Sequence, residues 1–146
     1  MSSPEFRVET RLDPTSADVA PIDQGLHGYN QRAADLGAIR RFACYARRDD
    51  GVLAGGALAR WWGTACELQQ IWVDEALRRR GIGAALMRQV ETTAIEHGCE
   101  LIYLDTFSFQ APEFYYQLGY HTACRFDGFP DGQSKFILQK SLALLP

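Results

Sequence analysis

Residues Glu67–His97 read ELQQIWVDEALRRRGIGAALMRQVETTAIEH, and this stretch decides the fold. Its first part, Glu67–Val73, is rich in apolar and aromatic residues and predicts a β-strand. After a turn rich in arginine and glycine, apolar residues recur at the spacing of one buried helical stripe, namely Ile82, Leu86, Val90 and Ala94. The stretch therefore predicts a strand, a glycine-rich turn and a helix that ends before Gly98.

The turn reads RRRGIG at residues 78–83 and indicates a binding site for an anion such as a phosphate. A helix N-terminus leaves its first backbone N–H groups unpaired and carries the positive end of the helix dipole. Glycines let the backbone approach the anion closely, and an arginine adds charge-assisted hydrogen bonds. The turn lacks the signatures of the commoner phosphate loops. On these residues alone, an ordinary basic turn before a helix is an equal alternative.

Two motifs resemble signatures of the GNAT superfamily of N-acetyltransferases. The first, Val73-x-x-x-x-Arg78-x-x-Gly81-x-Gly83 before an amphipathic helix, is similar to the motif A of that family. The second, APEFYYQLGY at residues 111–120, is similar to an Ala-x-x-x-Tyr-x-x-x-Gly-aromatic helix ending. Both motifs occur in the order and at the separation of the family, and the resemblance covers residues 50–142. It implies a coenzyme, acetyl-CoA, and transfer of its acetyl group to an amine.

The resemblance implies a mixed α/β domain of the GNAT fold, with a mostly antiparallel, splayed sheet of about seven strands flanked by about four helices. The strand before the glycine-rich turn would splay away from the next strand, 101–106. The residues themselves predict a first strand at Phe6–Arg11 and a helix cap at 13–16. One or two short helices should follow between Ala17 and Asn30, because glycines at 25 and 28 weaken a longer one.

Further along the chain, turn signals separate β-favouring segments. Asp-Gly at 50–51 lies between the segments 42–47 and 52–62 and predicts a hairpin. The pair Gly55-Gly56 indicates a bulge or a close backbone approach. Two late segments, 122–126 and 135–142, predict a C-terminal hairpin.

The composition excludes several classes of function. A chain of 146 residues with 47% hydrophobic and 23% charged residues suits one globular domain, 1–146. A formal net charge of −3 argues against general nucleic-acid binding and against a basic membrane-binding surface. We expect neither a secretory signal nor a membrane-spanning segment. Four scattered cysteines suit reduced thiols of a cytoplasmic protein and no metal site. The oligomeric state is open, with a homodimer among the alternatives.

The resemblance also implies which residues hold the coenzyme. Main-chain groups of the splayed strand would pair with the pantetheine arm, and N–H groups of the turn would hold the pyrophosphate. One of the three arginines is expected to be merely solvated, and Ser108 stands where many relatives have an asparagine. The residues implied as coenzyme contacts are Ile71, Trp72, Val73, Arg78, Arg79, Arg80, Gly81, Ile82, Gly83, Ala84, Ser108, Ala111, Phe114 and Tyr115.

Acetyl transfer to an amine needs a base for the amine, a donor to the carbonyl oxygen and an acid for the departing thiolate. Tyr115 matches the general acid of the family, and a phenol is protonated at pH 7. A backbone N–H near Val73 would be the donor. Glu67, on the strand before the turn, is the candidate base, although a solvated strand-end residue is an equal interpretation. On a regular strand Glu67 and Val73 share one face unless a bulge intervenes.

The acceptor is expected to be a primary amine of a small molecule, contacted by Tyr29, Asn30 and Phe107. The resemblance places the N-terminal region at one wall of the acceptor pocket, and Phe107 belongs to an aromatic segment near the second motif. Two alternatives are a non-catalytic module that binds acyl-CoA as a sensor, and an acetyltransferase for protein lysines or N-termini. The sequence does not identify the acceptor.

Overall fold

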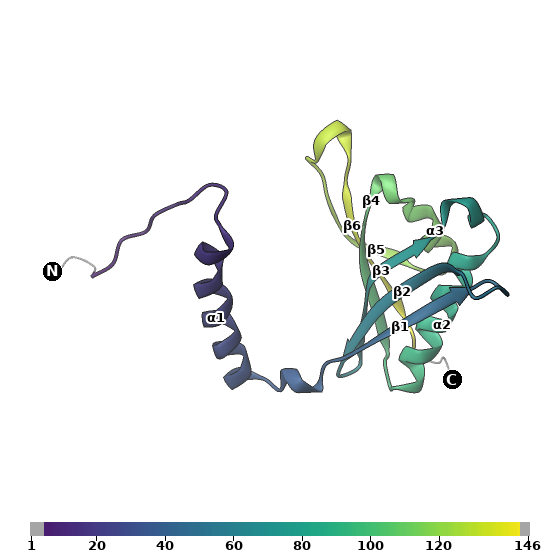
Figure 1. The fold of residues 1–146 in the computed structure, drawn as a ribbon, viewed down its shortest axis with the longest axis horizontal. Helices are drawn as coiled ribbons and strands as arrows, with labels where there is room; N and C mark the ends of the chain where they lie inside the picture. Colours follow the sequence, from purple (N-terminus) through teal and green to yellow (C-terminus); the bar gives the residue numbers. More distant parts are fainter. Residues whose placement is uncertain (1–4, 144–146) are drawn as a thin grey trace. The chain divides into compact units, whose positions relative to one another are not determined.

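The structure of this protein is a computed structural model that describes residues 5–143 (Figure 1). The chain divides after Leu36 into two units. The first unit contains α1 (Ser16–Ala33), which begins as predicted with a capping box between Thr15 and Asp18. The Asp18 N–H donates to Thr15 Oγ1 at 3.1 Å, and the Thr15 N–H donates to Asp18 Oδ2 at 2.9 Å. Single-domain organisation stays a prediction.

Two expectations for this first unit are wrong. Phe6–Arg11 forms no strand, because a strand requires ladder hydrogen bonds to a neighbour and none is formed by these residues in the described chain. The helix α1 is continuous rather than divided into short pieces, and it passes through Gly25, Gly28 and Pro21. A glycine lowers helix stability by about 1 kcal/mol without terminating the helix, so favourable neighbours and a strong cap outweigh it.

The second unit is built on a mostly antiparallel sheet in the order β1-β2-β3-β4-β6-β5. In residues 37–143 the sheet has six strands: β1 (Arg40–Arg47), β2 (Leu53–Trp62), β3 (Ala65–Val73), β4 (Leu101–Phe107), β5 (His121–Phe126) and β6 (Lys135–Ser141). The two predicted hairpins are confirmed as β1–β2 and β5–β6. Over the described chain the sheet thus has six strands where about seven were expected.

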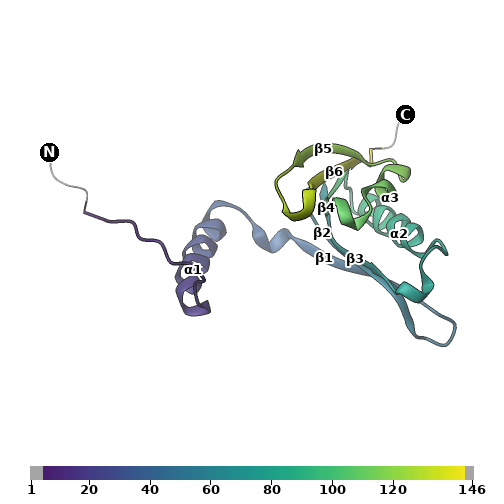
Figure 2. The same ribbon diagram turned by 90° about the horizontal axis from the view of Figure 1, so that it is seen from above.

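Two helices accompany this sheet, α2 (Ile82–Glu96) and α3 (Pro112–Gln117), so the described residues contain three α-helices in place of about four. Short 3-10 turns occur at Leu36–Ala38, Glu75–Leu77, Ser108–Gln110 and Pro130–Gly132. Figure 2 shows α2 and α3 on the same face of the sheet. No helix within residues 5–143 is long and apolar enough to cross a bilayer.

The core lies between this face and α2. The predicted helical stripe supplies Leu86, Val90 and Ala94, all buried, together with Met87. Strand residues meet them from the sheet, including Ala59, Cys66, Leu68, Ile102 and Leu104. Burial of this apolar surface holds α2 against the sheet and thereby positions the turn in front of it.

Two irregularities of β3 shape the site. The strand pairs with β4 at Ala65↔Leu101, Cys66↔Ile102 and Glu67↔Tyr103, and beyond these pairs the two strands separate, as the resemblance implied. Against β2 the register shifts between Leu58 and Ala59, so that Gln69 is an extra residue of β3.

The extra residue is a β-bulge that reverses which side chains face the core. Cys66 and Leu68 face the core before it, whereas Ile71 and Val73 pack against the core after it. Glu67 and Val73 consequently lie on opposite faces of the sheet.

Gly55 lies where β2 and β3 approach each other closely, as the Gly-Gly pair predicted. A Cβ at this position would be 2.7 Å from the backbone oxygen of Trp72 and 3.3 Å from Leu86 Cδ1. At Gly56 the nearest atom to a Cβ would be the backbone oxygen of Cys44, at 3.4 Å. The absence of a side chain at Gly55 therefore allows β2, β3 and α2 to pack together.

We expect Gly55→Ala to lower the free energy of unfolding by about 1–3 kcal/mol, because the added methyl must displace the backbone of β3. The neighbouring variant Gly56→Ala is the control and should be as stable as the wild type or up to about 1 kcal/mol more stable. Urea unfolding followed by circular dichroism measures both. Equal stability of the two variants would contradict this account of Gly55.

Candidate active site

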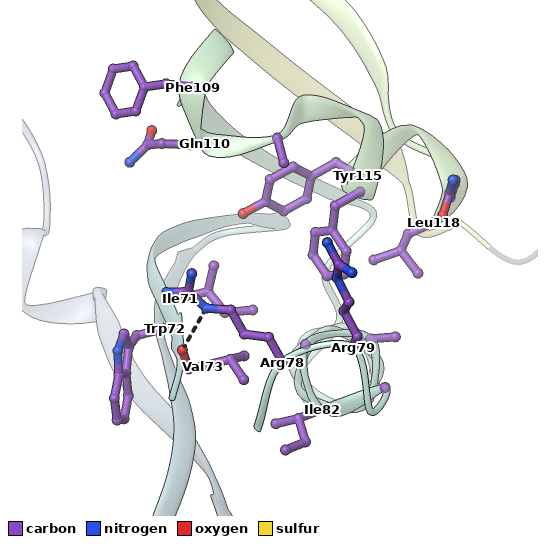
Figure 3. Close-up of a pocket in the computed structure, with 16 residues that line it drawn as sticks. Ile71, Trp72, Val73, Arg78, Arg79, Ile82, Phe109, Gln110, Tyr115 and Leu118 are labelled. Atoms are coloured by element: carbon purple, nitrogen blue, oxygen red, sulfur yellow. Dashed lines mark hydrogen bonds between the residues drawn. The ribbon is translucent and has the colours of Figure 1, made fainter. Parts of the chain in front are cut away.

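A cavity of about 870 Å³ lies where the end of β3, the start of α2 and the helix α3 come together (Figure 3). Its lining combines main-chain groups of the turn with apolar side chains and two arginines. The lining residues are Ile71, Trp72, Val73, Arg78, Arg79, Gly81, Ile82, Gly83, Ala84, Phe109, Gln110, Ala111, Phe114, Tyr115, Gln117 and Leu118. The two sequence motifs, separate along the chain, thus meet at one cavity.

The N-terminus of α2 has no side-chain cap among the described residues, in contrast to the capping box of α1. The first helical hydrogen bond runs from the Ala85 N–H to the Gly81 oxygen at 3.0 Å, so the N–H groups of residues 82–84 precede it without helical partners. Arg79 and Gly81 adopt the left-handed conformation, with φ of 65° and 80°. For arginine this conformation is strained, and such strain is concentrated at binding sites.

The edge of β3 that faces the cavity presents main-chain groups. Arg78 Nε donates to the Val73 oxygen at 3.3 Å, as Figure 3 shows. The main-chain N–H of the next residue, Asp74, points to the opposite edge, because it donates to the Ala54 oxygen of β2 at 2.9 Å. The N–H and C=O of a strand residue point to the same edge, so the N–H of Val73 also faces away from β2 and toward the opening between β3 and β4.

A second cavity of about 390 Å³ occupies this opening between β3 and β4. It is lined by Leu68, Gln69, Gln70, Ile71, Asp105, Thr106, Phe107, Gln110 and Tyr115. Ile71, Gln110 and Tyr115 line both cavities. A molecule in one cavity is therefore adjacent to a molecule in the other at the position of these three residues.

Tyr115 extends from α3 with its hydroxyl directed into this junction (Figure 3). The residue is 6% exposed, and its ring packs edge-on against Phe114 and Tyr120 at centroid distances of 5.0 and 5.8 Å. Burial raises the pKa of the Tyr115 phenol to about 12, because the low-dielectric surroundings disfavour the phenolate. Its hydroxyl is thus protonated at neutral pH and can donate a proton.

Glu67 lies elsewhere, in a third cavity of about 330 Å³ on the opposite face of the sheet. Its Oε2 accepts hydrogen bonds from Arg60 Nη2 at 2.9 Å and from the Tyr103 hydroxyl at 3.1 Å. Burial, together with the nearby Glu67 carboxylate, raises the pKa of Tyr103. Neither of the cavities that Tyr115 lines includes Glu67 among its described residues.

The structure brings most of the residues implied as coenzyme contacts to the larger cavity and leaves two outside its lining. Arg80 is exposed, and Ser108 is hydrogen-bonded instead to Gln133 and to the N–H of Ser134. Phe107 lines the smaller cavity. Tyr29 and Asn30 lie on α1, in the other unit of the chain.

Several lining residues were not expected from the sequence. Gln110 belongs to the turn just before α3, Gln117 and Leu118 lie at the end of that helix, and Gln69 is the bulge residue. The proximity of Gln110 to the second motif was the available signal. In residues 5–143 no group of three or more His, Cys, Asp or Glu side chains is placed to hold a metal ion.

Comparison with known proteins agrees with this fold. The sequence matches the acetyltransferase (GNAT) family model over residues 12–120. Blasticidin-S acetyltransferase of Streptomyces morookaense is 32% identical over 125 residues, covering 77% of this chain and 92% of that protein. The crystal structure of an acetyltransferase from Bacillus cereus has a TM-score of 0.76 at 29% identity, covering 91% of this chain and 97% of that one. An aminoglycoside 6′-N-acetyltransferase in complex with coenzyme A shares the fold, with a TM-score of 0.64 at 23% identity, covering 73% of this chain and 75% of that one.

The two motifs and the sheet with two separated strands define the class of the protein, an acyltransferase. The chain belongs to the GNAT family of acetyltransferases, which confirms the resemblance stated from its sequence. It is an acetyl-CoA-dependent N-acetyltransferase.

A partly buried ion pair fixes the end of α3 behind Tyr115. Lys140 Nζ on β6 donates to Glu91 Oε1 on α2 at 2.6 Å and to the Leu118 backbone oxygen at 2.8 Å. The Tyr120 hydroxyl donates to the other carboxylate oxygen of Glu91 at 3.1 Å. The pair thereby joins α2, the end of α3 and the sheet.

We expect Lys140→Met to lower the free energy of unfolding by about 1.5–3 kcal/mol, because it leaves the partly buried Glu91 carboxylate without its cation. Lys135→Met, on the same strand, is the control and should cost at most about 1 kcal/mol, since Lys135 makes a cation–π contact with Phe107. Urea unfolding of both variants tests this. Similar losses for the two lysines would show that the ion pair does not anchor α3.

Proposed function

We propose that this enzyme transfers the acetyl group of acetyl-CoA to a primary amine of a small molecule by direct attack, with both substrates bound at once. The observation that carries the proposal is the meeting of two cavities at Tyr115, one beside the glycine-rich turn and one between the separated strands. Volumes of about 870 and 390 Å³ are in the range of small-molecule sites. Proximity and orientation of two bound substrates can supply most of the acceleration.

Acetyl-CoA suits the chemistry of the larger cavity. The uncapped N-terminus of α2 and the side chains of Arg78 and Arg79 suit a pyrophosphate. The free edge of β3 at Ile71 and Val73 suits the amide groups of a pantetheine arm, and the relative solved with coenzyme A shares the fold. Arg80 and Ser108 stay predictions as coenzyme contacts, as do the acceptor contacts Tyr29, Asn30 and Phe107.

The residues at the junction suit the chemistry of acetyl transfer. Acetyl-CoA supplies a thioester whose carbonyl carbon the amine nitrogen attacks as the carbon–sulfur bond breaks. The Val73 N–H would donate a hydrogen bond to the carbonyl oxygen as it gains charge. Tyr115 Oη would give its proton to the departing sulfur and recover one from the nitrogen once the new amide forms. The ammonium loses its first proton to a base; if Glu67 has this role, its position requires a water chain.

The net charge of −3 and the names of two relatives support a cationic acceptor. Blasticidin S and aminoglycosides are the amines that those names give for those proteins. We propose that the enzyme works in the cytoplasm, because its cysteines are free thiols. The homodimer stays an alternative for the oligomeric state. Burial raises the pKa of the Cys66 thiol to about 12, which keeps this thiol protonated and unreactive.

We expect Gly83→Glu to weaken coenzyme A binding at least 100-fold. A Cβ at Gly83 would be 3.1 Å from Phe114 Cζ, and the added carboxylate would repel a pyrophosphate at the start of α2. Gln89→Glu adds the same charge on the exposed face of α2 and should bind as the wild type does. Isothermal titration calorimetry with coenzyme A measures all three proteins. Unchanged binding by Gly83→Glu would contradict the assignment of this cavity to the coenzyme.

We expect thiol release from acetyl-CoA with one class of amine, in a panel of blasticidin S, aminoglycosides, polyamines, amino acids and a lysine peptide. With that amine, Tyr115→Phe should lower kcat about 10²–10⁴-fold, because the thiolate then departs without an acid. Tyr116→Phe is the control from the same helix, since its hydroxyl pairs with Thr122 Oγ1 at 2.6 Å away from both cavities. Coenzyme binding without release across the panel would instead assign a sensor, and release only with the peptide a protein acetyltransferase.

A further inference from the structure

We propose that Gln69 and Asp105 bind the ammonium group of the acceptor, and that Asp105 takes the proton which this group must lose before it attacks. The inference rests on the acetyl-transfer function proposed above and names the residues that select a cationic primary amine. Both residues line the smaller cavity, which meets the larger one at Tyr115.

The pairing of β3 with β4 puts these two residues at corresponding positions. The last pair of the two strands is Glu67↔Tyr103, and Gln69 and Asp105 each follow it by two positions in the chain. Beyond this pair the strands separate, and the cavity occupies the opening. Gln69 and Asp105 therefore lie on the two strands that flank the opening, each two residues beyond the last pair, and both line the cavity between the strands.

Gln69 has a polar atom that lacks a partner. Its Oε1 is buried and accepts no hydrogen bond from any residue of the described chain. Among the buried side-chain N and O atoms of residues 5–143, Gln69 Oε1 is the one that has no hydrogen-bond partner. An unpaired buried acceptor costs about 1–3 kcal/mol, so its retention at the bulge of β3 calls for a ligand that donates a hydrogen bond.

The charge of the smaller cavity indicates that the ligand which donates to Gln69 is a cation. Asp105 is the charged residue among the described residues that line it, and the remaining polar lining consists of amide and hydroxyl groups. A primary ammonium carries three N–H donors and a positive charge, which suit an amide oxygen and a carboxylate. Phe107 adds an apolar wall, and its ring stacks on Phe109 at a centroid distance of 5.3 Å.

The proton balance of the reaction is complete with Asp105 as the base. The carboxylate takes one proton from R–NH₃⁺, which leaves a lone pair on the nitrogen. The nitrogen forms the bond to the acetyl carbon and the carbon–sulfur bond breaks. Tyr115 protonates the sulfur and regains a proton from the nitrogen, so the products are the amide, the free thiol and one proton that Asp105 releases to water.

A binding experiment tests the site without requiring turnover. ¹⁵N-labelled protein saturated with coenzyme A is titrated with propylammonium. The backbone amide signals of the residues that line the smaller cavity are followed by NMR in every variant, together with the Gln69 side-chain amide wherever Gln69 is present. We expect saturable binding that weakens at least tenfold in Asp105→Asn and in Gln69→Met, and in the wild type when tetramethylammonium, which has no N–H, replaces propylammonium. Glu113→Gln removes a carboxylate outside both cavities and should leave binding unchanged.

Stability distinguishes a ligand-binding role of Gln69 from a structural one. Gln69→Met keeps the length of the side chain and removes the unpaired oxygen, so its midpoint of urea unfolding should equal or exceed that of the wild type. A lowered midpoint in Gln69→Met would assign Gln69 to the fold. Propylammonium binding that is absent from the wild type, or equal in wild type, Asp105→Asn and Gln69→Met, overturns the proposal.

A kinetic experiment separates this inference from the function on which it rests. With the amine that supports thiol release, we expect Asp105→Asn to lower kcat/KM at least 100-fold. Normal release by Asp105→Asn, or a comparable loss found in Glu67→Gln instead, overturns the role of Asp105 while acetyl transfer stands. Release with no amine, together with propylammonium binding that depends on both residues, leaves the ammonium site in place and refutes the proposed function.

Discussion

The separation of β3 from β4 after the pair Glu67↔Tyr103 is the constraint on which the rest of this site depends. A strand inside a sheet normally pairs on both edges, and buried main-chain groups rarely lack partners. Here β3 pairs with β2 along its length but leaves one edge open near Val73. The start of α2 and the helix α3 both adjoin this edge, so the opening collects an anion-binding turn, free main-chain groups and the Tyr115 phenol.

Polar groups around the site have hydrogen-bond partners, whereas several polar groups at the opening have none among the described residues. Around the site, charges are paired: Lys140 binds Glu91 and the end of α3, and Arg60 binds Glu67 across the opposite face of the sheet. At the opening itself, the N-terminus of α2 has no side-chain cap and Gln69 Oε1 has no partner among the described residues. A fold that satisfies polar groups elsewhere and leaves them unpaired at one place is prepared to bind ligands there.

The backbone conformation at two residues, Gly55 and Arg79, also shapes the surroundings of the larger cavity. Gly55 allows β2 to approach Trp72 of β3 too closely for any other residue, and the left-handed Arg79 turns the chain into α2. Both features lie next to the cavity and neither increases the stability of the local segment. Their cost is offset by the apolar core beneath α2, where Leu86, Met87 and Val90 are buried.

The sequence by itself determined the elements that local patterns encode. The helical stripe of α2, the cap of α1, the Asp-Gly hairpin and the glycine-rich turn are predicted by residues close together in the chain. The glycine-rich turn and the motif around Tyr115 together indicated the family. Local patterns failed at Phe6–Arg11, since a strand needs a partner that a strand-like pattern cannot provide.

Only the tertiary structure decided the faces of β3. One extra residue at Gln69 inverts the alternation of side chains, because the strand period is two, and a bulge depends on the partner strand rather than on the bulged sequence. For this reason Glu67 is directed away from the cavities of Tyr115. Gln69 at the bulge and Asp105 on β4 belong to no motif, and they line the opening because the two strands separate there.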